Sequence, residues 1–412
     1  MCCCNATIEQ PIQCSLTKLR TEMKALSDSK LLKEIFSGVF SVSFFLVLYA
    51  SEVVNICFLN VLNIDSHKLI LPVYLGKVWL KFHILRLMIC SFFIKILLMF
   101  LVYLLTIVTS GRWIDEPLPD NDPGRFLILF IPGNPGALEY YIEFIKALYE
   151  GLQRTIPIWG ISHAGHVSPP PGCTVPKLQD NENLYSLEGQ IHHKMAFINT
   201  YVPRDRRVIL IGHSIGCYIV LELLKRLPHI QVIRCFLLFP TIERMSTSPQ
   251  GQWVWPMLTY LRLPALISVY ALSYLSPQMQ CRLLEWYFKD RSVPECVLNA
   301  SLNLFQLDCA KLCMHLARDE LENVTTLDVD NIRENLSRIT FYYGANDNWC
   351  PYSYYQDLKE IFPQGDIRLD KNNFEHAFVL ENSKEMGAVV SGWILEEILG
   401  TSKDVHRNSL LV

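Results

Sequence analysis

Between residues 125 and 400, short apolar runs alternate with longer segments whose apolar residues recur every three or four positions. Phe126–Ile131 (FLILFI) is apolar at every position, as expected of a parallel strand buried on both faces. Residues 139–152 carry apolar side chains at helical spacing, which predicts a helix. Further strands are expected at 156–161, 208–211, 235–239, 339–343 and 366–369, and further helices at 187–202, 215–227, 353–362 and 383–399. The alternation predicts an α/β fold in which helices cover both faces of a mostly parallel sheet.

Residues 241–337 do not alternate in this way. Within them, residues 253–276 are aromatic-rich and uncharged apart from Arg262, and Pro256 and Pro264 interrupt them. Because proline breaks or kinks a helix interior, we do not expect one membrane-spanning helix here. We expect instead a cap of short helices inserted into the α/β domain. Residues 253–276 then either dip into a lipid surface or form a buried helical cap, and both interpretations stay open.

Residues 1–111 form a hydrophobic extension that differs from the rest of the chain. Residues 87–109 carry a single charge, Lys95, in a stretch that exceeds the about 20 apolar residues needed to cross a bilayer. A central lysine costs about 2.5–3.5 kcal/mol, which a run of Leu, Ile and Phe side chains offsets. Candidate membrane segments therefore lie within 35–109, unless the gene model translates non-coding sequence here. The α/β domain is expected to span 112–412.

Composition narrows the possible partners. Charged residues make up 19% of the chain and apolar residues 50%. The chain is therefore more apolar than a typical soluble domain, in which roughly a quarter of the residues are charged. The net charge of −3, without any basic run, argues against nucleic acid as a partner. The 14 cysteines show no CxxC pairs, so we expect free thiols in a reducing compartment rather than a zinc site or a disulfide framework. No metal or cofactor is expected.

The strongest chemical signal lies in the segment VILIGHSIGCYIVLELL, where an apolar strand meets a helix. The junction reads Gly212-His213-Ser214-Ile215-Gly216, the GxSxG pattern of a nucleophile elbow. Both glycines are needed because a side chain at either position would collide with the strand or the helix. The turn lifts the serine hydroxyl above the edge of the sheet. The segment therefore predicts an α/β-hydrolase fold with Ser214 as the nucleophile.

A serine nucleophile needs a base, and the base needs a carboxylate to orient it. In this fold the acid and then the histidine follow the serine along the chain. Asp347 follows the expected strand 339–343, and His376 follows the expected strand 366–369. Every other histidine of the domain precedes Asp347 or lies in the polar tail beyond the last expected helix. The sequence therefore predicts Ser214, Asp347 and His376 as a catalytic triad.

The oxyanion formed during ester hydrolysis needs two backbone N–H donors. One is expected from Ile215, the residue after the nucleophile. The other is expected from the loop 132–136 (PGNPG), whose prolines carry no N–H. Gly133 and Asn134 are the candidates, and we favour Asn134. His163 follows another expected strand at the same edge, where it either contacts substrate or stiffens its loop.

These motifs together closely resemble the lipid droplet-associated hydrolase family of serine lipid hydrolases. The resemblance rests on FIPGNPG (130–136), WGISHAGH (159–166), GHSIG (212–216), LLFPTIERMS (237–246), TFYYGANDNWCP (340–351) and GDIRLDKNNFEHAF (365–378). It implies the triad Ser214, Asp347 and His376 and a droplet-binding stretch at 253–276. Residues 1–111 depart from the family's pattern.

The resemblance also implies a function and a location. It implies a cytosol-facing enzyme on lipid droplets and endoplasmic reticulum that hydrolyses lipid esters, sterol esters among them, with weak activity and effects on cholesterol and triacylglycerol balance. Its partners would be the lipid ester and the droplet or reticulum surface. Two alternatives stay open: a protein that organises the droplet surface with little turnover, and a soluble esterase for small substrates.

Overall fold

A computed structural model describes residues 107–110, 125–167 and 176–409. The chain divides into two units, residues 1–92 and 93–412, and every described residue belongs to the second. The extension 1–111 and its candidate membrane segments therefore lie outside the described residues, except for 107–110. Among the helices that the structure does describe, none combines the length and the apolar character needed to span a bilayer.

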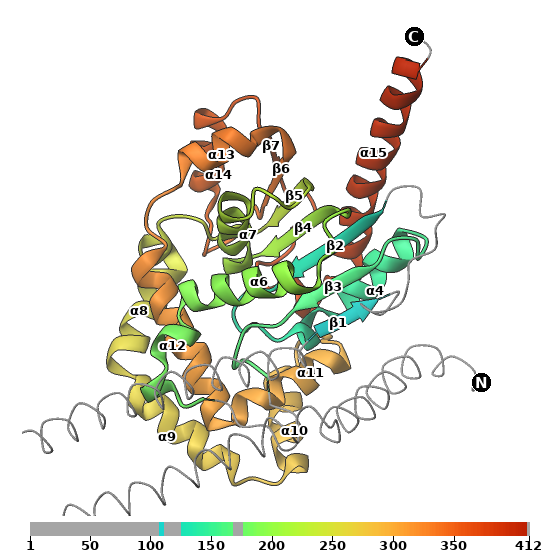
Figure 1. The fold of residues 1–412 in the computed structure, drawn as a ribbon. Coiled ribbons are helices and arrows are strands. Elements are labelled where there is room, and N and C mark those ends of the chain that lie inside the picture. The colour runs from blue at the N-terminus through green and yellow to red at the C-terminus, as the bar shows by residue number, and fades with distance from the viewer. Residues whose placement is uncertain (1–106, 111–124, 168–175, 410–412) are drawn as a thin grey trace, which may run out of the picture. The chain divides into compact units, whose positions relative to one another are not determined.

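The described strands form one seven-stranded sheet in the order β1-β3-β2-β4-β5-β6-β7 (Figure 1). The strands are β1 (Ile107–Ser110), β2 (Phe126–Ile131), β3 (Ile158–Ile161), β4 (Arg207–His213), β5 (Val232–Leu238), β6 (Ile339–Tyr343) and β7 (Asp366–Leu369). All neighbours pair in parallel except β1 and β3, which are antiparallel. The predicted, mostly parallel sheet is confirmed.

Helices cover both faces of the sheet, as the apolar strands require. They are α4 (Ile142–Gly151), α5 (Glu182–Tyr185), α6 (Leu187–Tyr201), α7 (Ile215–Arg226), α14 (Tyr352–Ile361) and α15 (Ser383–Ser409). Helices α4 and α15 pack together on one face, and α6 and α7 pack together on the other (Figure 1). The predicted helix 139–152 differs in its first turn, which is the 3-10 helix η1 (Leu138–Tyr141). Three of its four side chains are buried, and 3-10 turns are frequent at the N-terminus of an α-helix.

A helical insertion separates β5 from β6. It consists of α8 (Pro249–Tyr260), α9 (Arg262–Ser273), α10 (Pro277–Tyr287), α11 (Glu295–Leu302), α12 (Leu307–Asn323) and α13 (Val329–Asn335). Ser248 and Ser276 cap α8 and α10, and each is followed by a proline at the first helical position, where the missing N–H costs nothing. Helix α12 packs against α8 and α9, while α9 and α10 bury no residue. The predicted boundaries of the domain and its insertion remain predictions.

The backbones of α7 and the end of β2 approach each other closely. A Cβ atom on Gly216 would lie 2.3 Å from the carbonyl oxygen of Ile131. A Cβ atom on Gly212 would lie 2.7 Å from the carbonyl oxygen of Gly216. Both contacts are with backbone, which cannot rotate away. Only glycine therefore lets β4, α7 and β2 meet at this edge of the sheet.

Replacing Gly216 with alanine should lower the free energy of unfolding by at least about 2 kcal/mol, because overpacking against backbone forces the helix off the sheet. Gly392→Ala in α15 is the matched control, since a Cβ atom there meets nothing within 4 Å. That change should stabilise the chain by about 0.5–1 kcal/mol through helix propensity. Urea unfolding of the three proteins measures both differences, and equal stability of Gly216→Ala and wild type would contradict the packing described here.

Candidate active site

Ser214 lies at the turn between β4 and α7 in a strained conformation. Its φ of 53° and ψ of −124° are outside the regions that an ordinary L-residue adopts. Such a conformation costs on the order of 1–3 kcal/mol and persists only where the surroundings enforce it. Here the Ser214 N–H donates to the Leu238 carbonyl of β5 (3.0 Å), and the Cys217 N–H donates to the Ser214 carbonyl (2.9 Å). The sheet and the first turn of α7 together maintain this strained conformation of Ser214.

The three residues predicted as a triad lie within hydrogen-bond distance of one another. His376 Nε2 is 2.9 Å from Ser214 Oγ, and His376 Nδ1 is 2.6 Å from Asp347 Oδ2. Asp347 follows β6 and His376 follows β7, so parallel strands bring both loops to the edge where β4 ends. The imidazole therefore bridges a hydroxyl and a buried carboxylate, which is the arrangement that nucleophilic catalysis by serine needs.

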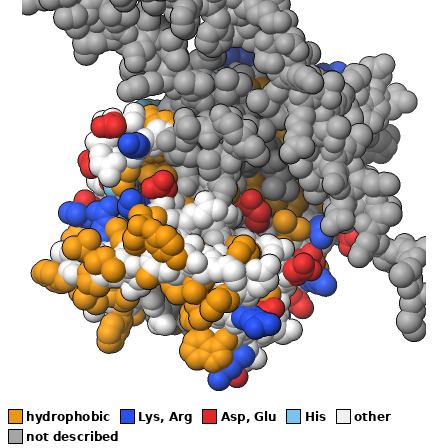
Figure 2. All heavy atoms as spheres, turned by 90° about the horizontal axis from the view of Figure 1, so that it is seen from below, with side chains coloured by type: hydrophobic (Ala, Val, Ile, Leu, Met, Phe, Trp, Pro, Cys, Tyr) orange, Lys and Arg blue, Asp and Glu red, His pale blue; other side chains and the backbone are white. Residues whose placement is uncertain are grey.

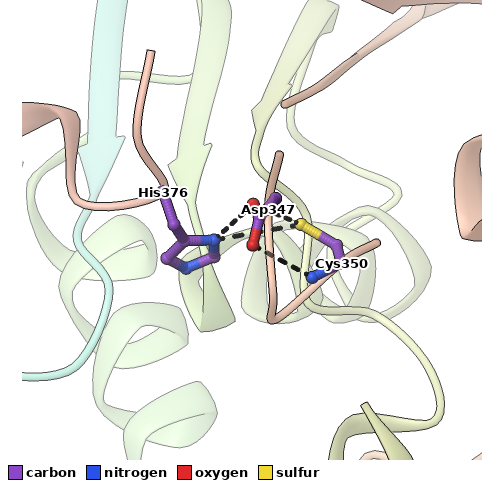
Figure 3. A group of neighbouring side chains, drawn as sticks. All are labelled: Asp347, Cys350 and His376. Carbon is purple, nitrogen blue, oxygen red and sulfur yellow. Dashed lines mark hydrogen bonds and ion pairs between the residues drawn. The ribbon is translucent and has the colours of Figure 1, made fainter. Parts of the chain in front are cut away.

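Asp347 accepts more hydrogen bonds than the sequence suggested. Its Oδ1 accepts from the Trp349 N–H (2.7 Å), and its Oδ2 accepts from the Cys350 thiol (2.9 Å) as well as from His376 (Figure 3). Burial by itself raises the pKa of this carboxyl. The charge on His376 and these hydrogen bonds outweigh burial and hold the pKa below its usual value. Asp347 is therefore ionised at neutral pH, although it is buried.

Asp347, Cys350 and His376 also form the one group of at least three His, Cys, Asp or Glu side chains, within the part of the chain that the structure describes, whose ligand atoms all lie within 4.8 Å (Figure 3). A metal would need the thiolate of Cys350. Burial raises the pKa of this thiol well above its usual value, and the thiol already donates to Asp347. The geometry favours a hydrogen-bonded cluster, and the expectation of no metal stays a prediction.

The loop after β2 lies against Ser214, the candidate nucleophile. A Cβ atom on Gly133 would lie 3.0 Å from the Cβ atom of Ser214. The Gly133 N–H donates to the Tyr141 hydroxyl (3.0 Å), so it is already engaged. The Asn134 N–H has no hydrogen-bond partner among the described residues, and the Ile215 N–H opens α7, where helical N–H groups have no partner within the helix. This favours Asn134 and Ile215 as the oxyanion donors.

Two buried histidines hold the far end of this loop. The Gly136 N–H donates to His166 Nδ1 (2.9 Å), and the His163 N–H donates to the Gly136 carbonyl (2.7 Å). A Cβ atom on Gly136 would lie 2.2 Å from the His163 ring, so the ring packs directly on the loop. Burial lowers the pKa of both histidines, that of His166 to about 3, which keeps them neutral. Of the two roles considered for His163, this geometry favours stiffening of the loop.

The side chain of Asn134 is anchored to the helical insertion. Its Nδ2 donates to the Cys313 carbonyl and to Glu320 Oε1, both at 3.1 Å and both on α12. Glu320 is buried, and burial raises the pKa of its carboxyl to about 8. Sequence reasoning missed this residue because it lies 186 positions from Asn134. The one signal for Glu320 in the sequence is a carboxylate among the apolar residues of a helix.

The strand order, the glycine-bounded turn at Ser214 and the order of Ser214, Asp347 and His376 along the chain define an α/β hydrolase. The predicted fold class is confirmed. A model of the lipid-droplet associated hydrolase family matches residues 124–379. The chain belongs to this family, which confirms the resemblance seen in the sequence.

The match with curated relatives covers nearly the full length of those relatives. A lipid droplet-associated hydrolase of Gallus gallus is 43% identical over 297 residues, which is 71% of this chain and 92% of the relative. A protein of the same name from Homo sapiens is 40% identical over 310 residues, again 71% and 92% of the two chains. Among solved structures, the haloalkane dehalogenase DbeA of Bradyrhizobium elkani has a TM-score of 0.48 and 15% identity, covering 70% of this chain and 93% of that one.

Replacing Glu320 with glutamine should make the free energy of unfolding less dependent on pH. The folded chain keeps this carboxyl protonated up to about pH 8, whereas an unfolded chain releases the proton near 4.5. Wild type should therefore lose stability as pH rises from 4.5 to about 8, by at most about 1.4 kcal/mol per pH unit, and Glu320→Gln should not. Urea unfolding at several pH values across this window measures the difference.

The matched control is Glu322→Gln, which removes an exposed carboxylate from the same helix. It controls for the change in net charge. If the unfolding free energies of Glu320→Gln and wild type ran parallel across the window, Glu320 would not be held protonated by the fold.

Proposed function

We propose that this chain is a serine hydrolase that cleaves lipid esters at the surface of lipid droplets. The observation that carries the proposal is the continuous hydrogen-bond path from Ser214 Oγ through His376 to the buried Asp347. Family membership supports the lipid substrate, because the curated relatives are named for a hydrolase associated with lipid droplets.

The reaction follows from the positions of the groups. Ser214 Oγ attacks the ester carbonyl carbon while His376 Nε2 accepts the hydroxyl proton. The negative charge that forms on the carbonyl oxygen is stabilised by the N–H groups of Ile215 and Asn134. The C–O bond to the alcohol then breaks, and His376 returns its proton to the departing alkoxide. Water, deprotonated by His376, attacks the acyl-serine in the same way and releases the fatty acid and free Ser214.

An exposed apolar surface gives the enzyme a means of reaching a lipid. Large apolar side chains lie exposed on α8, α9 and α10 and in the turns between them (Figure 2); they are Trp253, Met257, Tyr260, Leu261, Leu263, Ile267, Tyr270, Tyr274, Met279, Leu283, Trp286 and Tyr287. Monomeric soluble proteins rarely expose so many neighbouring apolar side chains, and such patches mark binding surfaces. The segment 253–276 is therefore exposed rather than buried, and the apolar surface continues beyond it onto α10. We infer that this surface docks on the droplet monolayer or on the endoplasmic reticulum.

The finer features of the proposal rest on the family resemblance. They are a preference for sterol esters, weak turnover, effects on cholesterol and triacylglycerol balance, and an orientation that places the domain in the cytosol. A second candidate function is that of a protein that organises the droplet surface with little turnover. The exposed apolar helices favour it independently of the triad, because they would bind lipid whether or not Ser214 reacts.

Ser214→Ala should abolish hydrolysis of a short soluble p-nitrophenyl ester, with at least about a thousandfold loss in kcat, because no other group forms the acyl intermediate. A fluorophosphonate probe should label wild type and not this variant. Ser353→Ala, an exposed serine on α14, is the control and should behave as wild type. Equal labelling of Ser214→Ala and wild type would refute Ser214 as the nucleophile.

Replacing Trp253 and Trp286 with glutamate should weaken binding to phospholipid-coated triolein droplets by at least about tenfold for each side chain, since burying one such side chain contributes about 1.5–3 kcal/mol. The two residues are 77% and 67% exposed, so the fold should tolerate the change. Hydrolysis of the soluble ester should remain at the wild-type rate.

The matched control for lipid binding is Tyr352→Glu, because Tyr352 is an exposed aromatic residue on α14, outside the apolar surface. Flotation of the proteins with the droplets measures the bound fraction. If Tyr352→Glu weakened binding as much as the tryptophan variants did, binding would not depend on the α8–α10 surface.

A further inference from the structure

A chain of three hydrogen bonds links the loop after β2 to the loop that carries His376. The Gly133 N–H donates to the Tyr141 hydroxyl oxygen (3.0 Å). The Tyr141 hydroxyl is 2.7 Å from His213 Nδ1, and His213 Nε2 is 2.8 Å from the backbone carbonyl oxygen of His376. His213 is the residue next to Ser214, so the chain passes through the nucleophile elbow itself.

The two ends of the chain fix the direction of every bond in it. A backbone N–H can only donate, and a carbonyl oxygen can only accept. His213 Nε2 must therefore carry the proton that is donated to the His376 carbonyl. In a neutral imidazole Nδ1 is then an acceptor, so the Tyr141 hydroxyl donates to it and its oxygen is left to accept from Gly133. Each of the three hydrogen bonds therefore has one direction, and the three directions are compatible with one another.

The surroundings keep both side chains neutral and immobile. Tyr141 is 3% and His213 is 5% exposed. The Tyr141 ring packs 4.7 Å from Phe130, and the His213 ring packs 4.9 Å from Phe378, centroid to centroid. Burial lowers the pKa of His213 to about 3 and raises that of Tyr141, so neither group ionises near neutral pH. A protonated His213 would have two donors and would break the bond from Tyr141.

We propose that Tyr141 and His213 are positioning residues that set the placement of His376 relative to Ser214 and hold Gly133, and with it the Asn134 N–H, beside the nucleophile. The inference rests on the proposed function and names two residues that act in it without contacting substrate. His213 holds the backbone of the base, while Tyr141 connects that bond to the oxyanion loop. Without the Tyr141 hydroxyl, Gly133 loses its acceptor and His213 loses the donor to its Nδ1, so both loops lose a restraint.

The test compares Tyr141→Phe with Tyr140→Phe. Both tyrosines are buried in η1, but the Tyr140 hydroxyl bonds to Ser301 Oγ (3.1 Å) and takes no part in the chain. Tyr141→Phe should lower kcat for the soluble ester by about ten- to a hundredfold, because small misplacement of reacting groups has that effect, and should leave KM within about twofold. Tyr140→Phe should leave kcat unchanged. The melting temperature of each variant separates lost stability from lost turnover.

A further comparison tests whether the two residues act as one unit. In the double variant Tyr141→Phe/His213→Ala, the loss in kcat should be smaller than the product of the losses in the two single variants, because both single variants remove the bond between Tyr141 and His213. Multiplicative losses, or equal losses in Tyr141→Phe and Tyr140→Phe, would overturn the proposal. A wild type that neither hydrolyses the ester nor reacts with a fluorophosphonate would instead count against the proposed function.

Nitrogen-15 NMR of histidine-labelled wild type tests the chain without reference to activity. His213 should show a protonated Nε2 and an unprotonated Nδ1, unchanged between about pH 5 and 8, as expected for a neutral buried imidazole. The titratable groups that act on this ring are Tyr141, His376 and Asp347. Glu375, the residue before His376, is exposed and forms an ion pair with Arg291. A proton on Nδ1, or titration of His213 in this range, would overturn the proposal.

Discussion

The rest of the site depends on the turn between β4 and α7, where the positions of Gly212 and Gly216 have no room for a side chain. Ser214 takes a positive φ there because Gly212 and Gly216 let strand, helix and the end of β2 approach within backbone contact. The same approach brings the loop after β2 to Ser214, so the packing of these elements also places the candidate oxyanion donors. The conformational strain at one residue is therefore offset by the packing of three elements.

Burial and hydrogen-bond partners together set the protonation states of Asp347, Glu320 and His213. Asp347 stays ionised because several donors compensate for its burial, whereas Glu320 is held protonated because it has few. His213 is neutral, and its two ring nitrogens have opposite roles. An unpartnered polar group in such a place costs about 1–3 kcal/mol, which explains why each of these side chains is bonded to another. The network restricts the loops to one arrangement.

The sequence predicts where those candidate site residues lie whose placement follows from chain order. The GxSxG junction and the parallel topology predict that Ser214, Asp347 and His376 lie at one edge of the sheet. Cys350 and Tyr141 could not be found in this way, because their roles depend on where a thiol and a phenol point in the folded chain. The apolar surface was only partly visible in the sequence. Helix α10 alternates polar and apolar residues, so its exposed side chains do not form an apolar run.

In the proposed reaction, Ser214 attacks the substrate while the N–H groups of Ile215 and Asn134 hold the oxyanion. The most direct measurement is a crystal structure of the protein after reaction with an alkyl phosphonate, whose tetrahedral phosphorus stands in for the carbonyl carbon at the transition state. We expect phosphorus bonded to Ser214 Oγ, with the phosphoryl oxygen within about 2.7–3.1 Å of the Ile215 and Asn134 backbone nitrogens. A phosphonate on another residue, or a phosphoryl oxygen directed away from Ile215 and Asn134, would contradict the proposed reaction.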